Sequence, residues 1–212
     1  MTDASPAPEP AFFPNKLGRI ALLAFEEIVG HNGLNAVLNR AGLGHWINNY
    51  PPGNYDTAFP FADLGQIQCA LEELYGPRGG RGLALRAGRA CFKHGLREFG
   101  PMVGISDLTY RLLPLNMKLK VGAQVFSKTI DRLTGQVVRL DETPESLAWV
   151  LSRCPICWGR QAEAPCCHLA VGILQESLYW VSGGKNFLVE EVACIAQGDA
   201  TCTIKVDRQP VD

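Results

Sequence analysis

The chain has 212 residues, enough for one domain with a substantial core. Hydrophobic residues make up 47% and charged residues 19%, as in an ordinary globular protein. The net charge of −1 argues against general affinity for nucleic acid or an anionic membrane, and no apolar run approaches the roughly 20 residues that span a bilayer. The N-terminus has no basic start and no apolar core, so we expect no secretory signal and a cytoplasmic location, where thiols stay reduced.

The first quarter of the chain is expected to be a tail followed by two helices and a loop. Residues 1–15 are rich in Pro, Ala and acidic side chains, which predicts a disordered tail ahead of a single domain over 16–208. Apolar residues recur at helical spacing over 17–28, and a shorter helix is expected over 33–40. The prolines and glycine within 45–60 predict a loop.

Two further helices with a glycine-rich stretch between them are expected next. A helix over 62–75 should end at Gly76 and Pro77. The stretch 78–89 combines glycines with arginines, which is typical either of a tight turn with solvated arginines or of a helix start that holds a carboxylate or phosphate. The apolar residues of 105–126 predict a buried helix, either plain core or one wall of an apolar cavity.

Strand patterns dominate the last third of the sequence. Residues 136–142 and 146–152 alternate or run apolar around a turn, and so predict a hairpin. A helix over 167–180 follows, and then a second hairpin formed by 186–194 and 201–206. The predicted fold class is therefore α+β, with helices first and then an antiparallel sheet of about four strands interrupted by one helix.

Six of the eight cysteines lie between Cys154 and Cys202, and thiols repeated in so short a segment point to a metal ion more than to disulfides. Zinc is the expected ion. The second hairpin brings Cys194 close to Cys202, while strand alternation places Glu191 on the opposite face unless a bulge or twist intervenes. A further ligand would come from Cys166-Cys167 ahead of the helix. Four protein ligands would make a structural site and not a catalytic one.

The spacing of these residues resembles that of the 4-vinyl reductase domain. The pattern is Cys167-x4-Gly172, then Glu191-x2-Cys194-x7-Cys202. Domains of this family occur in the sensor modules of phenol-responsive transcription activators and in a bacteriochlorophyll-biosynthesis protein of about this length. The resemblance implies a zinc ion held by Cys167, Glu191, Cys194 and Cys202. It also implies the fold of NO-signalling and Golgi-transport ligand-binding domains, which are often dimeric, so a homodimer is expected.

The resemblance is close over 150–206 and weaker over 16–150, and it leaves the ligand set partly open. The gap between Cys167 and Glu191 is one residue longer than the family pattern, so Cys166 remains an alternative ligand. Cys154-x2-Cys157 is an extra pair that the phenol sensors lack. A ligand set that recruits Cys157 therefore stays open as well.

Three functions are compatible with the sequence. The first is a non-catalytic binding protein for a hydrophobic small molecule. The 4-vinyl reductase resemblance makes a (bacterio)chlorophyll-pathway tetrapyrrole the leading ligand, with propionates suited to Arg81, Arg86 or Arg89. The second is an enzyme that acts on a tetrapyrrole vinyl group, although no dinucleotide fingerprint, catalytic triad or paired carboxylates stand out. The third is a dimeric adaptor or aromatic-compound sensor. The aromatic candidates for a pocket are Phe126, Trp149, Trp158 and Tyr179.

Overall fold

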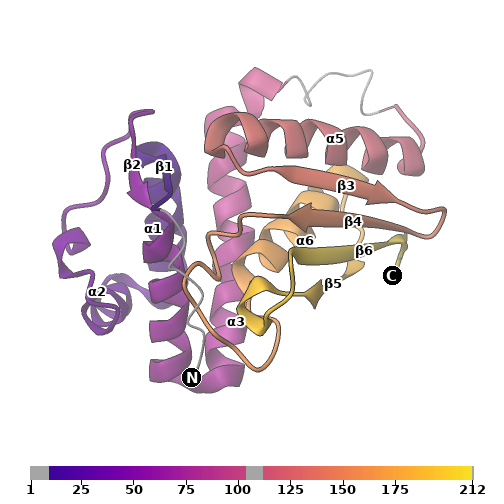
Figure 1. The fold of residues 1–212 in the computed structure, drawn as a ribbon. Coiled ribbons are helices and arrows are strands. Elements are labelled where there is room, and N and C mark those ends of the chain that lie inside the picture. Colours follow the sequence, from indigo (N-terminus) through magenta and orange to yellow (C-terminus); the bar gives the residue numbers. More distant parts are fainter. Residues whose placement is uncertain (1–9, 104–111, 212) are drawn as a thin grey trace.

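The computed structural model describes residues 10–103 and 112–211, and helices dominate its first half while a sheet forms the second (Figure 1). The first half contains β1 (Phe12–Pro14), α1 (Asn15–Val29), α2 (His31–Arg40), β2 (Thr57–Pro60), α3 (Phe61–Val103) and α5 (Leu115–Thr134). The second contains β3 (Val138–Glu142), β4 (Ser146–Leu151), α6 (His168–Ser182), β5 (Phe187–Ala193) and β6 (Cys202–Pro210). This order confirms the predicted α+β class.

The four-stranded sheet has the order β3-β4-β6-β5, with every neighbouring pair antiparallel. Both predicted hairpins are present, and pairing of β4 with β6 joins them into one sheet. Helix α5 runs along β3, and α6 lies between the sheet and α3 (Figure 1). The enclosed side chains form one apolar cluster between α5, α6 and the sheet, and a second one among α1, α2, α3 and the cysteines.

The start of the described chain differs from the predicted tail. Residues 12–14 form β1 and pair with β2, so the expectation of disorder up to residue 15 is wrong for them. The reason is tertiary: Phe13 is buried and its ring packs on Phe61, 4.2 Å between centroids. A composition-based prediction does not see that contact.

The first helical segment of α3 ends at Gly76, as predicted, and a second helical segment begins directly after it. Gly76 has φ 73° and ψ 164°, which interrupts the helix, and the helix resumes at once. The tight turn predicted within the stretch 78–89 is therefore wrong, because these residues are helical. Gly80 instead permits close packing across the bend, since a Cβ atom there would lie 2.7 Å from the Glu72 Cα.

The predicted helix 105–126 is only partly covered, because residues 104–111 lie outside the described residues. Its described part is α5, which follows Pro114 and continues past residue 126 to Thr134. Gly135, in the left-handed region with φ 62°, ends the helix.

Helices α3 and α6 cross with their backbones in close contact. A Cβ atom on Gly88 would lie 2.2 Å from the Leu169 carbonyl oxygen, and one on Gly172 would lie 2.1 Å from that of Leu85. Neither position can hold a side chain without separating the helices. This crossing fixes the start of α6, where Cys167 lies, against the middle of α3.

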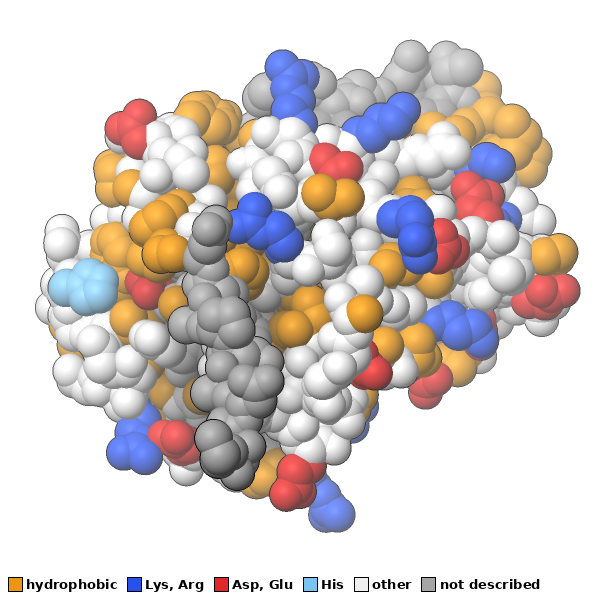
Figure 2. Space-filling view, viewed as in Figure 1, with side chains coloured by type: hydrophobic (Ala, Val, Ile, Leu, Met, Phe, Trp, Pro, Cys, Tyr) orange, Lys and Arg blue, Asp and Glu red, His pale blue; other side chains and the backbone are white. Residues whose placement is uncertain are grey.

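The length of the apolar helices and the charge on one face describe the surface of the molecule. No helix among the described residues is long and apolar enough to cross a bilayer. On the face shown in Figure 2, positive and negative side chains of the described residues are interspersed without a large patch of one sign.

Candidate functional site

Six cysteine side chains meet in one buried cluster, which we call the cysteine cluster: Cys154, Cys157, Cys166, Cys167, Cys194 and Cys202. The measured Sγ–Sγ distances are 3.4 Å for 154–167, 3.3 Å for 157–202, 3.7 Å for 167–202, 3.8 Å for 166–194, 3.9 Å for 167–194 and 4.0 Å for 194–202. For comparison, a tetrahedral zinc site with Zn–S of about 2.3 Å has sulfurs about 3.8 Å apart. Four of the six distances are close to that value, and the 154–167 and 157–202 distances are shorter.

Three segments of chain place these sulfurs. Cys154 and Cys157 lie in the turn after β4, and Cys166-Cys167 immediately precede α6. Cys194 follows β5, and Cys202 begins β6. The connection between them is fixed locally, because the Cys194 N–H donates to the Asp199 carboxylate (2.8 Å) and the Ile195 N–H donates to the Cys202 sulfur (3.3 Å).

Glu191 joins the cluster through an irregularity in the sheet. The β5–β6 register shifts between Glu191 and Ala193, which supplies the bulge that a regular strand lacks. One carboxylate oxygen, Oε2, accepts a hydrogen bond from the Cys167 N–H at 2.7 Å. The other, Oε1, is buried without a partner, and burial raises the pKa of the group to about 8. An orphaned buried carboxylate oxygen beside thiols suits a cation.

The four residues that the 4-vinyl reductase pattern selects form one complete candidate ligand set. One ligand atom each from Cys167, Glu191, Cys194 and Cys202 lies within 4.8 Å of all the others. A second set satisfies the same condition, namely Cys154, Cys157, Cys167 and Cys202. The alternative that recruits Cys157 is therefore also built into the structure.

Neighbouring thiols influence one another's ionisation. Hydrogen bonds from nearby sulfurs, that from Cys157 foremost, lower the pKa of Cys154 and of Cys194. The thiolate is the form that binds metal ions. Hydrogen bonds among the same sulfurs, that with Cys154 foremost, raise the pKa of Cys157, Cys167 and Cys202. A metal ion that binds in the cluster would therefore displace protons from these thiols.

Gln68 of α3 holds the chain segment that carries Cys166 and Cys167. Its side chain is buried, its Nε2 donates to the Cys166 carbonyl (3.0 Å), and its Oε1 accepts from the Leu169 N–H (3.0 Å). The Leu169 N–H belongs to the first turn of α6 and has no acceptor within that helix. Gln68 thus caps α6 from a different helix.

Replacing Gln68 by Leu is expected to lower the free energy of unfolding by about 3 kcal/mol, because the Cys166 carbonyl and the Leu169 N–H would stay buried without partners. Urea unfolding measures the change. Gln66→Leu is the matched control, since Gln66 is exposed on the same helix. Equal stability of the two variants would contradict the role given to Gln68.

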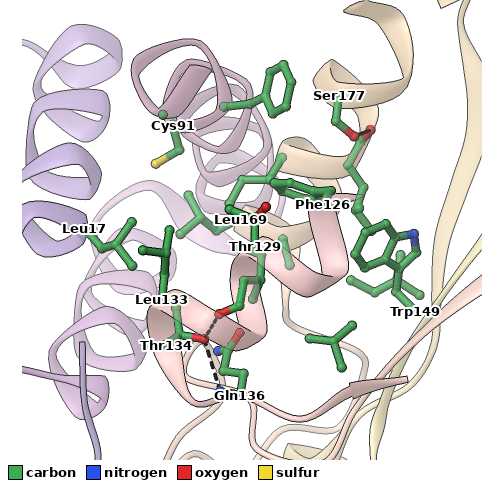
Figure 3. Close-up of a pocket in the computed structure, with 18 of the residues that line it drawn as sticks. Leu17, Cys91, Phe126, Thr129, Leu133, Thr134, Gln136, Trp149, Leu169 and Ser177 are labelled. Atoms are coloured by element: carbon green, nitrogen blue, oxygen red, sulfur yellow. Dashed lines mark hydrogen bonds between the residues drawn. The ribbon is translucent and has the colours of Figure 1, made fainter. Parts of the chain in front are cut away.

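An apolar cavity of about 250 Å³ lies between α1, α3, α5, α6 and the sheet (Figure 3). Its few polar side chains are largely hydrogen-bonded to nearby backbone. The hydroxyls of Thr129, Thr134 and Ser177 donate to carbonyl oxygens within their own helices, at 2.7, 2.6 and 2.8 Å. No charged side chain is among the described residues that line the cavity. The space therefore suits a neutral, apolar guest.

Two of the six residues predicted for a pocket line this cavity. Phe126 of α5 and Trp149 of β4 face it with their rings 5.4 Å apart, edge to face (Figure 3). The other four lie elsewhere. Trp158 packs edge-on against Phe61, Tyr179 is 45% exposed, and Arg81 and Arg86 are exposed on α3.

The remaining aromatic walls of the cavity were missed in the sequence. Phe13 of β1, Phe92 and Phe99 of α3 and Trp180 of α6 line it. Phe92, Leu96 and Phe99 follow one another at helical spacing, and that periodicity is the signal that could have identified them.

The cavity and the cysteine cluster share a wall. Cys154, Pro155 and Ile156, which form the turn after β4, line the cavity on one side, while the Cys154 sulfur belongs to the cluster. A guest in the cavity would therefore lie next to the segment that an ion would fix.

Comparisons with known proteins identify the fold. No protein-family model matches the chain, and no curated protein matches it. Solved H-NOX structures do match. One is an unliganded Fe(II) H-NOX protein from K. algicida, with TM-score 0.57 and 10% identity over 94% of this chain and 97% of that one. Another is an H-NOX protein from S. oneidensis in the Fe(II)NO state, with TM-score 0.53 and 13% identity over 92% and 99%.

The chain thus has a mixed helix and antiparallel-sheet fold resembling that of H-NOX domains. The phenol-responsive sensory domain of the transcription activator PoxR, with phenol, matches at TM-score 0.44 and 19% identity over 69% of this chain and 73% of that one. A score that low supports no argument about this chain.

Proposed function

We propose that this protein is a non-catalytic binding domain that holds an apolar small molecule in the cavity and is stabilised beside it by zinc in the cysteine cluster. The observation that carries the proposal is the cavity itself, which is lined by apolar side chains and lacks charged groups among its described lining residues. General acid–base catalysis needs titratable groups at the reacting atoms, and the described lining residues offer only the thiols of Cys91 and Cys154. Binding is the function that these walls support best.

The size of the cavity indicates the class of guest. An apolar cavity of about 150 Å³ binds benzene, and this one measures about 250 Å³. A neutral molecule of one or two rings therefore fits. Phe92, Phe126 and Trp149 would contact it by ring stacking or edge-to-face packing. We infer a phenol- or naphthalene-sized aromatic compound as the ligand class.

The zinc part of the proposal rests on donor chemistry. Each candidate set offers four protein ligands, which suit a closed tetrahedral site. The set with Glu191 and Cys194 ties the start of α6 to the β5–β6 hairpin, and the set with Cys154 and Cys157 ties the turn after β4 to the start of α6 and to β6. The resemblance to the 4-vinyl reductase pattern supports the same ligands. An ion in either set supplies stability, and an ion bound by Cys154 and Cys157 also holds the cavity wall at Pro155 in place.

A tetrapyrrole is the second candidate ligand, because solved structures with this fold are described in terms of heme and porphyrin. Iron-bound heme fits poorly here. Histidine and methionine are missing from the described lining residues, which offer only the sulfurs of Cys91 and Cys154 as axial ligands. Burial raises the pKa of Cys91 to about 12, so it stays a neutral thiol. A metal-free tetrapyrrole needs no axial ligand, but the elements around the cavity would have to move apart to hold so large a molecule.

Filling the cavity tests the proposal. Ala123 of α5 is buried on the cavity wall, so Ala123→Phe places a ring in the space that a guest would occupy. We expect at least a ten-fold loss of affinity for naphthalene, with a change in unfolding free energy of about 1 kcal/mol or less. Calorimetry and quenching of tryptophan fluorescence measure the binding.

Ala36→Phe is the matched control, because it makes the same substitution at an exposed position of α2. It should bind naphthalene like the wild type. Failure of the wild type to bind phenol, indole or naphthalene would refute the small-aromatic assignment. Tight binding of a chlorophyllide in the same assay would favour the tetrapyrrole instead.

A further inference from the structure

We infer that the cysteine cluster is a two-ion centre in which Cys167 and Cys202 bridge two divalent metal ions. The inference deepens the proposed zinc site and rests on it. It starts from the two candidate ligand sets, each of which is complete and which have two residues in common. The shared residues are Cys167 and Cys202, whose sulfurs are 3.7 Å apart.

That shared distance is the edge of a thiolate tetrahedron. Zinc–sulfur bonds of about 2.3 Å give an edge of about 3.8 Å, so two tetrahedra can share the Cys167–Cys202 edge. Cys154 and Cys157 then complete the first ion's coordination. The Cys154 sulfur lies 3.4 Å from that of Cys167, and the Cys157 sulfur lies 3.3 Å from that of Cys202. Cys194 completes the second, 3.9 and 4.0 Å from the same two sulfurs, together with the Glu191 carboxylate.

The number of buried donors also favours two ions. One tetrahedral ion takes four ligands, which would leave a Cys pair or the Glu191–Cys194 pair buried beside it without a role. Glu191 Oε1 is the clearest case, because it has no hydrogen-bond partner and no contact with water. Buried polar atoms are rarely left in that state. Two ions that share an edge use Glu191 and five of the six cysteines of the cluster, all except Cys166.

The buried guanidinium of Arg160 lies next to the cluster and suits the net negative charge of a two-ion centre. Five thiolates and one carboxylate around two divalent ions leave the centre net negative. The Arg160 side chain is 6% exposed, pairs with Glu72 through Nη2 at 2.9 Å, and is electrostatically coupled to Cys166. Its Nε and Nη1 atoms are buried with no partner. Such a guanidinium is costly to bury unless negative charge lies nearby.

Metal content per chain tests the inference. The whole protein, purified without chelator, should contain two zinc ions per chain by elemental analysis and by native mass spectrometry. The double variant Cys154→Ser/Cys157→Ser should retain one, and so should Cys194→Ser. Cys69→Ser should keep two, because Cys69 lies outside the cluster. One ion in the wild type, or iron with acid-labile sulfide, would overturn the inference.

A cobalt titration of the wild-type protein removes any dependence on variant folding. Two Co²⁺ equivalents should bind, and the paramagnetic signal of the first should weaken as the second enters, because bridging thiolates couple the two spins. Saturation at one equivalent would contradict the two-ion centre while leaving the single-zinc proposal intact. A chain that binds no zinc or cobalt at all would refute both. Naphthalene binding reports on the cavity separately.

Discussion

Cys167→Ala is expected to lose essentially all bound zinc and to lower the free energy of unfolding by about 5 kcal/mol or more. Cys167 belongs to both candidate ligand sets, and its N–H holds the Glu191 carboxylate. Structural zinc contributes about 10–16 kcal/mol to the folding of small zinc peptides; a larger domain retains part of its stability from its core. For a domain of this size the melting temperature should fall by about 10 °C or more.

The control is Cys91→Ala, which also removes a buried thiol but one outside the cluster. It should keep its zinc and lose little stability. Elemental analysis and thermal unfolding with and without a chelator provide the measurements, and the chelator should affect the wild type but not Cys167→Ala. A Cys167→Ala protein with normal zinc content and an unchanged melting temperature would show that the cysteine cluster is not a structural zinc site.

Gly172→Ala is expected to destabilise the fold by about 3 kcal/mol through overpacking. Its new Cβ would lie 2.1 Å from the Leu85 carbonyl oxygen, and because that atom belongs to a helix backbone the two helices must move apart. The melting temperature should fall by about 6–12 °C. Since the same helix begins next to Cys167, zinc should also be released at a lower chelator concentration.

Gly82→Ala is the matched control for that substitution. Gly82 is helical, lies in α3 and would place its Cβ in open space. There, alanine should stabilise the helix by about 0.5–1 kcal/mol. Chemical denaturation of the two variants measures the contrast. Similar stabilities would mean that the α3–α6 crossing tolerates a wider separation than the backbone contact suggests.

Local patterns were enough to predict the sheet and most of its connections. The alternation on both sides of Thr143-Pro144 and the turn around Gly198 marked the two hairpins. The order of the strands across the sheet depends on pairing of β4 with β6, which are far apart in sequence. No local pattern contains that information.

The glycine-rich stretch illustrates the same limit. Glycine at 79, 80 and 82 has low helix propensity, which favoured a turn. The helix forms because Gly80 lets it pass close to Glu72 across the bend at Gly76. Tertiary packing here outweighs the low helix propensity of glycine. The contact between Gly80 and Glu72 that decides it is seen only in the folded structure.

The candidate site shows both cases. A hairpin brings residues on either side of its turn together, so the spacing Cys194-x7-Cys202 was sufficient to group these two cysteines. Glu191 and Cys167 joined them only through the resemblance to the 4-vinyl reductase pattern. The bulge that turns Glu191 toward the sulfurs is a property of the β5–β6 pairing. The sequence shows that Glu191 needs such a bulge to reach the site, but not that the bulge forms. Phe126 and Trp149 reach the cavity, whereas Arg81 and Arg86 do not, because the face of a helix that borders a cavity depends on how that helix packs.

Anomalous diffraction from crystals of the wild-type protein grown with 4-bromophenol tests the central claim most directly, since bromine marks the position of the guest. The account predicts a bromine peak inside the cavity, between Phe126, Trp149 and the turn at Pro155. A protein whose crystals show bromine only on the outer surface, at saturating 4-bromophenol, would contradict the assignment of this cavity as a binding site.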